Sequence, residues 1–367
     1  MNKRGDRMKK CALTPVAMLW FAAVASAQSY YVLNLGVLPG QTDSFATGIN
    51  AGGTVVGNSG NRPFIFQKPC SMTPLGIPVD GRASASAISK QGKAVGSSTS
   101  SLGRQRALSY EGGVISDLGG PPDRDESATA ISSWQIPVGV ESVPGLPIAS
   151  YAVFYYGGTT HELPRVPINP PDGWPFIQNV TGVNDILQVT GFLTNSQIGF
   201  VSAPGFGAWT QIQGIPGNAS QSIVPFAINE NGHVVGGQGF PKPHAFFSTN
   251  PKAPAVDLGT LNSADPYRMS VAKGVNVHDW VVGFSDSSPT SGPLAFLHNG
   301  STMIDLNTRL VNGTGWVLNI ATGINDDGLI IGNGTYNGYQ RAFLLIPVGY
   351  PWDFDPRCNV VKGPPLF

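Results

Sequence analysis

Acidic side chains recur in the segments of this sequence that are richest in turn-forming residues. They are Asp43, Asp80, Asp123 with Asp125 and Glu126, Asp172, and Asp265. Carboxylate oxygens are the hard ligands that Ca²⁺ prefers, so a fold that brings five such segments together could hold this ion. The alternative is that aspartate, proline and glycine are simply the residues of which turns are made. One hypothesis is therefore a Ca²⁺ site, and the other is a protein without a cofactor.

Large aromatic side chains and arginines lie in the same kind of segment. The aromatic residues are Trp174, Tyr267 and Trp316, and the arginines are Arg268 and Arg309. Exposed aromatic rings can stack on sugars, and arginines can hydrogen-bond to sugar hydroxyls. We therefore expect Tyr267, Arg268, Arg309 and Trp316 to form a ligand pocket, with Trp174 as a further platform. In the alternative interpretation, each aromatic side chain only covers the end of its own sheet.

No catalytic signature accompanies these residues. The sequence contains no H-E-x-x-H, no G-x-S-x-G, no phosphate-binding glycine loop and no C-x-x-C. Acid and base side chains also do not recur at a fixed spacing. These absences favour a binding or scaffold protein over an enzyme.

The first 27 residues are typical of a secretory signal. The basic segment "MNKRGDRMKK" precedes the apolar "CALTPVAMLWFAAVASA", and Ala25–Ser26–Ala27 gives an A-x-A cleavage pattern before Gln28. We expect cleavage near Ala27 and export to the periplasm or the extracellular space. The protein would then meet an extracellular or envelope ligand, either a carbohydrate or a protein.

Composition narrows the class of the remaining chain. Charged residues make up only 12%, whereas glycine numbers 47 and proline 31, which is typical of an all-β protein with many tight turns. No basic run remains after residue 27, so nucleic acid is not an expected partner. No later apolar run approaches the ~20 residues of a membrane span. We expect a monomer with no membrane span in its mature form.

A repeated unit organises most of the chain. An Ile or Val followed by Asn or Ser recurs at seven anchors, Ile49, Ile88, Ile131, Val183, Ile228, Val275 and Ile324. Eight residues after each anchor there is a glycine, at Gly57, Gly96, Gly139, Gly191, Gly236, Gly283 and Gly332. Seven matches at one offset indicate a structural requirement, which we expect to be a close approach of neighbouring backbones.

The chemistry of the unit predicts four strands. A strand ending in "GIN" or "AIS" enters a turn in which Asn or Ser accepts backbone hydrogen bonds and a glycine such as Gly53 is left-handed. A β-branched strand such as "TVVG" follows, then a strand such as "HAFF", and then one ending in "DLG". Four-stranded sheets repeated in this way are typical of a β-propeller.

The ends of the repeat array predict how the ring closes. The seventh unit lacks a fourth strand, and a lone copy of that strand, "YYVLNLG", lies at residues 30–36. We therefore predict a seven-bladed β-propeller of four-stranded antiparallel blades over residues 28–350. Its N-terminal strand should pair with the last blade, which removes unpaired sheet edges. Residues 351–367 form a C-terminal tail.

Loop lengths predict where function lies on this ring. The turns between the first and second strands and between the third and fourth strands are short, whereas the other two connections vary in every unit. Alternate connections emerge on opposite faces, so one face carries diverse loops, and we expect the ligand there. The alternative function is a hydrolase or lyase acting on a lactone or polysaccharide, with Ca²⁺ in the central channel.

The repeats resemble those of the secreted HAF-repeat proteins. Their unit reads approximately D-L-G-x-L-x-G, then A-x-G-I-N-x-x-G-x-V-V-G, then H-A-F. The matching segments here are "LNLGVLPG" with "ATGINAGGTVVG", "DLGTL" at residues 257–261 and "HAFF" at residues 244–247. The resemblance implies an exported propeller and carries no catalytic residues. Units three and four depart from the pattern, since Pro137 falls in a strand and "VNDILQVTG" lacks the turn glycine, so we expect bulged or irregular blades there.

Two cysteines remain after removal of the signal. Cys70 lies in a turn of unit one and Cys358 lies in the tail after unit seven. Units one and seven are neighbours in a closed ring, and the exported compartment is oxidising. We predict a disulfide between Cys70 and Cys358.

Overall fold

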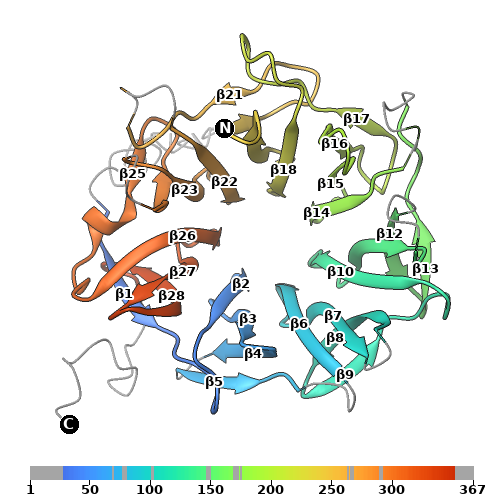
Figure 1. Ribbon diagram of the computed structural model, residues 1–367, viewed down its shortest axis with the longest axis horizontal. Helices are drawn as coiled ribbons and strands as arrows, with labels where there is room; N and C mark the ends of the chain where they lie inside the picture. Colours follow the sequence, from blue (N-terminus) through green and yellow to red (C-terminus); the bar gives the residue numbers. More distant parts are fainter. Residues whose placement is uncertain are drawn as a thin grey trace, which may run out of the picture.

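Each repeat folds into one antiparallel sheet because its turns reverse the chain three times over short distances. In the computed structural model, seven such four-stranded sheets surround a common axis (Figure 1), which confirms the predicted seven-bladed β-propeller. The structure describes residues 28–67, 70–76, 81–100, 103–145, 150–167, 173, 176–262, 264, 268–288 and 292–351. In these ranges no helix is long and apolar enough to cross a membrane.

The blades follow the chain in order, and each is given from its innermost strand outward. Blade 1 contains β2 (Phe45–Ile49), β3 (Val55–Ser59), β4 (Arg62–Gln67) and β5 (Ser71–Pro74). Blade 2 contains β6 (Gly81–Ile88), β7 (Ala94–Ser100), β8 (Gln105–Glu111) and β9 (Val114–Asp117). Blade 3 contains β10 (Asp125–Ile131), β11 (Pro137–Ser142), β12 (Ser150–Tyr156) and β13 (Thr159–Glu162). Blade 4 contains β14 (Asn179–Val183), β15 (Val189–Phe192), β16 (Gly199–Ser202) and β17 (Trp209–Gln211); blade 5 contains β18 (Ile223–Ile228), β19 (Val234–Gln238), β20 (His244–Ser248) and β21 (Val256–Asp257); blade 6 contains β22 (Ser270–Val275), β23 (Val281–Ser285), β24 (Leu294–His298) and β25 (Met303–Asp305).

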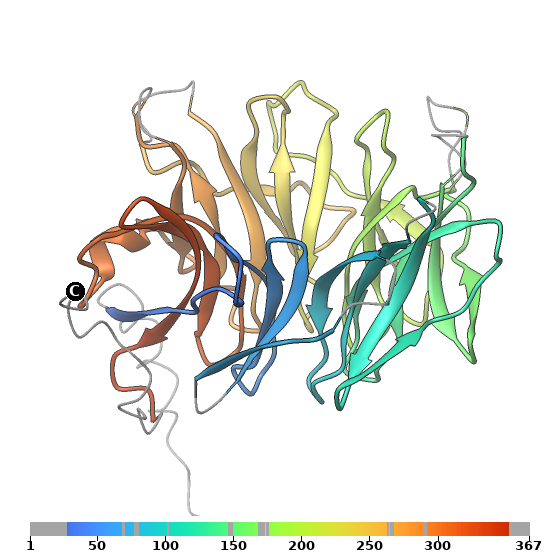
Figure 2. The ribbon, with the colours of Figure 1, turned by 60° about the horizontal axis from the view of Figure 1, so that its bottom comes forward.

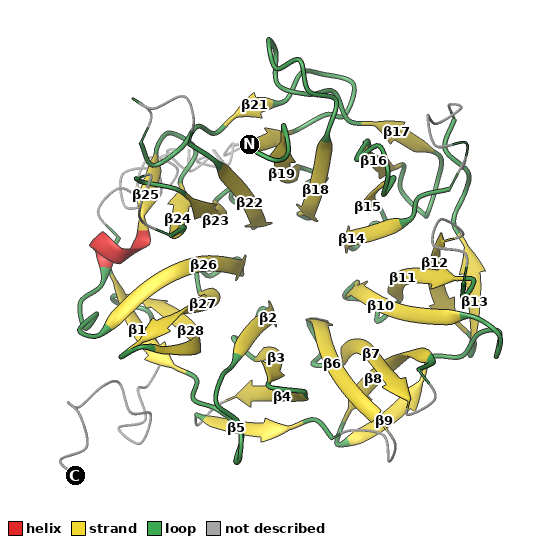
Figure 3. Cartoon of the chain, in the orientation of Figure 1, coloured by secondary structure: helices red, strands yellow, loops and turns green. Residues whose placement is uncertain are grey.

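Blade 7 is completed by the N-terminus, as predicted. It contains β26 (Trp316–Ile324), β27 (Ile330–Tyr336), β28 (Tyr339–Pro347) and, outermost, β1 (Tyr30–Asn34). The β1–β28 register runs from Tyr30 opposite Pro347 to Asn34 opposite Phe343. A 3₁₀ helix, η1 (Leu306–Arg309), lies between β25 and β26 (Figure 3). Closure by β1 gives the last blade its fourth strand and covers the edge of β28.

The repeat glycine is explained by a β-bulge in the innermost strand of every blade. The pairing skips one residue two positions before each anchor, at Thr47, Ser86, Thr129, Thr181, Phe226, Lys273 and Thr322. In every blade, a Cβ on the repeat glycine would collide with the carbonyl oxygen of the residue just before its pairing partner, as Gly57 would with that of Phe45. Glycine is required because the bulge brings the two backbones too close for any side chain.

The turn after each anchor is also uniform, including in units three and four. The left-handed position is glycine in four blades, but Gln135, Leu187 and Asp279 adopt φ values of 62°, 59° and 61° in the others. Pro137 is the first residue of β11, a position at which proline is tolerated although it has no backbone N–H to donate to the sheet. The bulges expected in blades 3 and 4 are therefore present, but they do not distinguish these two blades, because the same turn and the same bulge occur in all seven.

The two faces of the ring differ. On one face the first-to-second connections are uniform short turns, whereas the third-to-fourth connections lengthen from residues 112–113 in blade 2 to residues 249–255 in blade 5. On the other face the connections range from the tight β3–β4 turn to the long segment before β18. We call these the turn face and the loop face. Figure 2 shows the ring from a tilted side. Between the blades lie separate apolar clusters, one of which joins Tyr30 and Val32 of β1 to Trp316 and Phe343.

Candidate functional site

The predicted aromatic pocket does not lie open on the loop face. Trp316 is only 7% exposed, and its ring packs 5.0 Å from that of Tyr336 and 6.1 Å from that of Phe343. Arg268 is 8% exposed, and Arg309 ends η1 with its Nε buried. The structure therefore places Trp316 inside blade 7 rather than on an exposed rim. Tyr267 and Trp174, the other two members of the prediction, lie outside the described residues.

The acidic residues of the predicted Ca²⁺ site are not brought together where the structure describes them. Asp43 accepts a hydrogen bond from Gly60 N at 2.9 Å within blade 1. Asp123 contributes only its carbonyl oxygen, to Arg104 Nη1 at 3.3 Å. Within the described ranges no three His, Cys, Asp or Glu side chains are placed to hold a metal ion. Asp80, Asp172 and Asp265 lie outside these ranges, as does Cys358, so the disulfide with Cys70 stays a prediction.

An ammonium group lies among the innermost strands. The Nζ of Lys273, at the bulge of β22, lies 3.3 Å from the ring centroid of Phe226, at the bulge of β18. Burial lowers the pKa of Lys273 to about 8. The charged form of this lysine would repel Ca²⁺ at this level of the ring. The described residues therefore fit a central calcium ion poorly.

Glu126 has a different role from that of a loop ligand. It lies in β10, is 1% exposed, and its Oε1 is 3.3 Å from Arg106 Nη1 of blade 2. Arg106 also forms a bidentate pair with Asp117, while Glu141, opposite Glu126 in the sheet, pairs with Arg124 at 2.9 Å. Burial, with the carboxylates of Asp117 and Glu141, raises the pKa of Glu126 to about 7 although Arg106 opposes the shift. This network joins blades 2 and 3 beneath the loop that connects them.

The raised pKa of Glu126 predicts a pH-dependent stability. Between about pH 4.5 and pH 7 the unfolded chain loses this proton while the folded protein keeps it, so the free energy of unfolding should fall as pH rises through this window. The expected change is about 2–3 kcal/mol. Glu126→Gln should remove most of this dependence and should be more stable than the wild type at pH 8. Urea denaturation at several pH values measures it; Glu162→Gln, at an exposed glutamate of β13, is the control and should retain the wild-type slope. Equal slopes for Glu126→Gln and the wild type would contradict the assignment.

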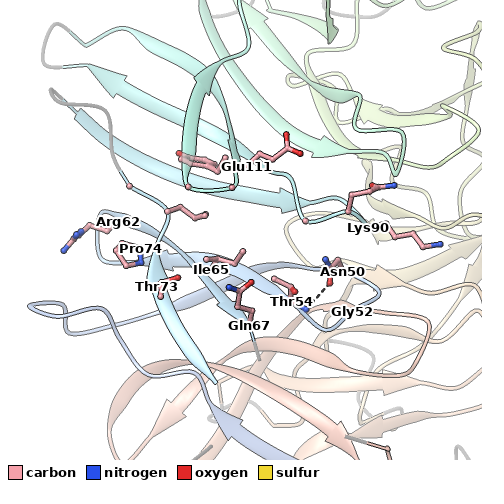
Figure 4. Close-up of a pocket in the computed structure, with 17 residues that line it drawn as sticks. Asn50, Gly52, Thr54, Arg62, Ile65, Gln67, Thr73, Pro74, Lys90 and Glu111 are labelled. Carbon is pink, nitrogen blue, oxygen red and sulfur yellow. Dashed lines mark hydrogen bonds between the residues drawn. The ribbon is translucent and has the colours of Figure 1, made fainter. Parts of the chain in front are cut away.

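A groove with a volume of about 790 Å³ lies between blades 1 and 2 (Figure 4). Its wall on blade 1 comes from β4 and β5 and includes Arg62, Ile65, Gln67, Thr73 and Pro74. Its wall on blade 2 comes from the turn at residues 90–92 and the turn at residues 110–113. Such a volume and such a mixture of polar and apolar groups are typical of small-ligand sites.

The polar side chains of blade 1 are available to a ligand in this groove. Gln67 and Thr73 are exposed, and neither these side chains nor that of Arg62 hydrogen-bonds to another described residue. Ile65 and Pro74 provide apolar surface beside them (Figure 4). Across the groove, Glu111 is held by Lys93 at 3.2 Å. The groove therefore offers uncommitted hydrogen-bonding groups on the blade 1 wall, and Lys90 together with the paired Glu111 on the blade 2 wall.

A second cavity, of about 320 Å³, lies at the ring axis on the turn face. All seven blades line it through their anchors and the turns that follow, and it shares Asn50 and Lys90 with the groove. We call it the channel mouth. Because the two cavities share residues, the groove and the channel mouth adjoin one another on the turn face.

Asparagine amides join neighbouring blades around the channel mouth. The Nδ2 of the asparagine that follows each anchor donates to the backbone carbonyl of the equivalent residue in the next blade, through the pairs Asn184–Asn229 (3.1 Å), Asn229–Asn276 (2.8 Å), Asn276–Asn325 (3.1 Å), Asn325–Asn50 (3.2 Å) and Asn50–Ser89 (3.3 Å). Their Oδ1 atoms accept turn N–H groups, as the sequence predicted. Ser89 and Ser132 carry a hydroxyl in place of this amide, and each hydroxyl oxygen accepts a hydrogen bond within its own turn, from Lys93 N at 3.1 Å and from Ile136 N at 3.3 Å.

Comparison with known proteins supports the fold alone. No protein-family model and no curated protein match the sequence. Among solved structures, YCF48 from Cyanidioschyzon merolae has a TM-score of 0.54 at 13% identity, over 87% of this chain and 99% of its own. Virginiamycin B lyase from Staphylococcus aureus has a TM-score of 0.53 at 11% identity, over 87% and 99%. The extracellular domain of BT4673 from B. thetaiotaomicron has a TM-score of 0.50 at 10% identity over 86% of this chain, which spans only 40% of that domain.

Proposed function

We propose that this protein is an exported carbohydrate-binding propeller that holds its ligand in the groove between blades 1 and 2. The observation that carries the proposal is the groove itself, in which the free side chains of Arg62, Gln67 and Thr73 lie beside the apolar Ile65 and Pro74. Sugars combine hydroxyls with apolar ring faces, and this wall offers partners for both. Export rests on the signal expected in residues 1–27, and the resemblance to HAF-repeat proteins agrees with it.

A binding role is favoured over catalysis by what the groove contains. Its only described carboxylate, Glu111, is paired with Lys93, so no second acid faces it as a glycosidase would require. Among the solved relatives one is a lyase by name and another is the extracellular domain of a larger chain. At identities of 10–11%, these names support only that the fold can serve in binding or in catalysis. The preference for binding in this protein rests on the groove.

The double variant Gln67→Ala, Thr73→Val should lose at least tenfold in affinity for a glycan that the wild type binds. Each lost hydrogen bond is worth about 0.5–1.5 kcal/mol, and about 1.4 kcal/mol is tenfold. A glycan array on the mature protein selects the ligand, and isothermal titration calorimetry measures the loss. The melting temperature should stay within a few degrees because both side chains are exposed.

Thr249→Ala is the matched control, because Thr249 occupies in blade 5 the position that Gln67 occupies in blade 1 and does not line the groove. It should bind the glycan as the wild type does. Wild-type protein that retains no glycan, or a double variant that binds as tightly as the wild type, would overturn the proposal.

A further inference from the structure

Trp134 is the most exposed of the large hydrophobic side chains in the described part of the chain, at 70%. It lies on the turn face, in the turn between β10 and β11 of blade 3. Its indole N–H donates to the carbonyl oxygen of Asp185, in the equivalent turn of blade 4, at 2.7 Å. This bond fixes one edge of the indole to the neighbouring blade and leaves most of the ring surface in solvent. An exposed but oriented indole can stack on a ligand at a small cost in conformational entropy.

The ring adjoins the channel mouth, which is lined by Ser133, directly before Trp134, and by Asp185. Two further carboxylates line the mouth, those of Glu230 and Asp326, against a single cation, Lys90. Each carboxylate accepts a backbone N–H from an adjacent turn: Asp185 from Ser133, Glu230 from Asp185 and Asp326 from Val277. A carboxylate has two oxygens and about four acceptor sites, so each can accept further donors. The mouth is thus rich in acceptors and carries an excess of negative charge.

We propose that Trp134 and the channel mouth form a subsite for a neutral oligosaccharide, with one sugar ring stacked on the indole and its hydroxyls donating to Asp185 and Glu230. The inference rests on the proposed function and narrows its ligand class. A uronic acid at this subsite would place its carboxylate among three others, whereas a neutral hydroxyl supplies the donors that these acceptors need.

The position of the subsite also predicts the length of the ligand. The groove and the channel mouth share Asn50 and Lys90, so a chain lying in the groove reaches the mouth at these residues. Trp134 and Asp185 lie on blades 3 and 4, farther around the ring. A ligand that contacts both the groove and Trp134 must therefore be an extended oligosaccharide rather than a single sugar.

The test uses calorimetry of the full mature protein with cellohexaose, chitohexaose and hexagalacturonate. We expect at least one of the neutral hexasaccharides to bind and hexagalacturonate to bind at least tenfold more weakly. Trp134→Ala should weaken the neutral ligand at least tenfold, whereas Trp134→Phe, which keeps an aromatic face, should stay within about threefold of the wild type. Tyr156→Ala is the control, since Tyr156 is 66% exposed in the same blade and lines neither described cavity; it should bind as the wild type does.

The outcomes separate this inference from the function on which it rests. Wild-type affinity in Trp134→Ala, with a loss in the groove variant, would overturn the subsite and leave the groove in place. Failure of the wild type to bind either neutral hexasaccharide, or tighter binding of hexagalacturonate, would overturn the neutral-ligand inference. If Trp134→Ala does not fold, Trp134→Leu takes its place, because leucine keeps apolar volume without a stacking face, and the same loss is expected.

Discussion

A chain of residues 28–367 that lacks residues 30–36 should not form a stable ring. The deletion removes β1, whose five residues pair with β28 from Phe343 to Pro347. It also removes Tyr30, Val32, Leu33 and Leu35 from the core, where all four are buried. At about 1.5–3 kcal/mol for each large apolar side chain, this loss is comparable with the whole stability of a typical domain, about 5–15 kcal/mol. The edge of β28 would be exposed as well, which favours aggregation.

Size-exclusion chromatography and thermal melting measure this result, and complementation supplies the control. A synthetic peptide of residues 28–36 added in trans should restore part of the melting temperature, because the closing strand needs no covalent link to pair. The same peptide with Val32→Asp should not, since it places a charge at a fully buried position. A deletion variant that remains monomeric and melts with the wild type would show that another element closes the ring.

The blade count and the closing strand were predictable from sequence because each depends on a local requirement that is repeated. The glycine eight residues after each anchor is one example. Its neighbour in space is a carbonyl of the same hairpin, so the constraint appears within a short stretch of sequence and appears seven times. The left-handed turn position was harder to predict, since Leu187 adopts φ 59° without the expected glycine. Hydrogen bonds of the turn hold the chain in this conformation against the preference of the residue.

Features that depend on contact between blades were not predictable in the same way. Glu126 follows "PPDRD", which reads as a polar loop, and only the fold places it in β10 against Arg106 of blade 2. Trp316 follows a turn and reads as a rim aromatic, but the partners that bury it, Tyr336 and Phe343, come from later strands. The groove depends on the spacing between β5 and the turns of blade 2. A single sequence carries no direct record of such spacing. The sequence therefore predicts the ligand on the loop face, whereas the groove and the channel mouth lie along the turn face.

Trp316→Ala should lower the free energy of unfolding by about 3–5 kcal/mol, as expected for a buried tryptophan replaced by alanine. The physical reason is packing, because the ring lies against Tyr336 and Phe343 and belongs to the cluster between blades 6 and 7. Its Nε1 has no hydrogen-bond partner among the described residues, so no polar contact there is lost on substitution. Trp316→Phe should therefore cost much less, since it keeps an aromatic ring and removes a buried, unpartnered N–H.

Urea denaturation should compare the stability of Trp316→Ala with that of Trp134→Ala. The two variants remove the same type of side chain, one from a buried site and the other from an exposed site. We expect the first to lose stability and to bind the glycan normally in its folded fraction. The second loses one hydrogen bond to blade 4, so it should keep its stability within about 1.5 kcal/mol, and it should lose affinity. If Trp316→Ala instead lost binding and kept its stability, the ligand site would be the pocket of Tyr267, Arg268, Arg309 and Trp316 that the sequence predicts. The two substitutions thus decide between the loop face and the turn face with one pair of measurements.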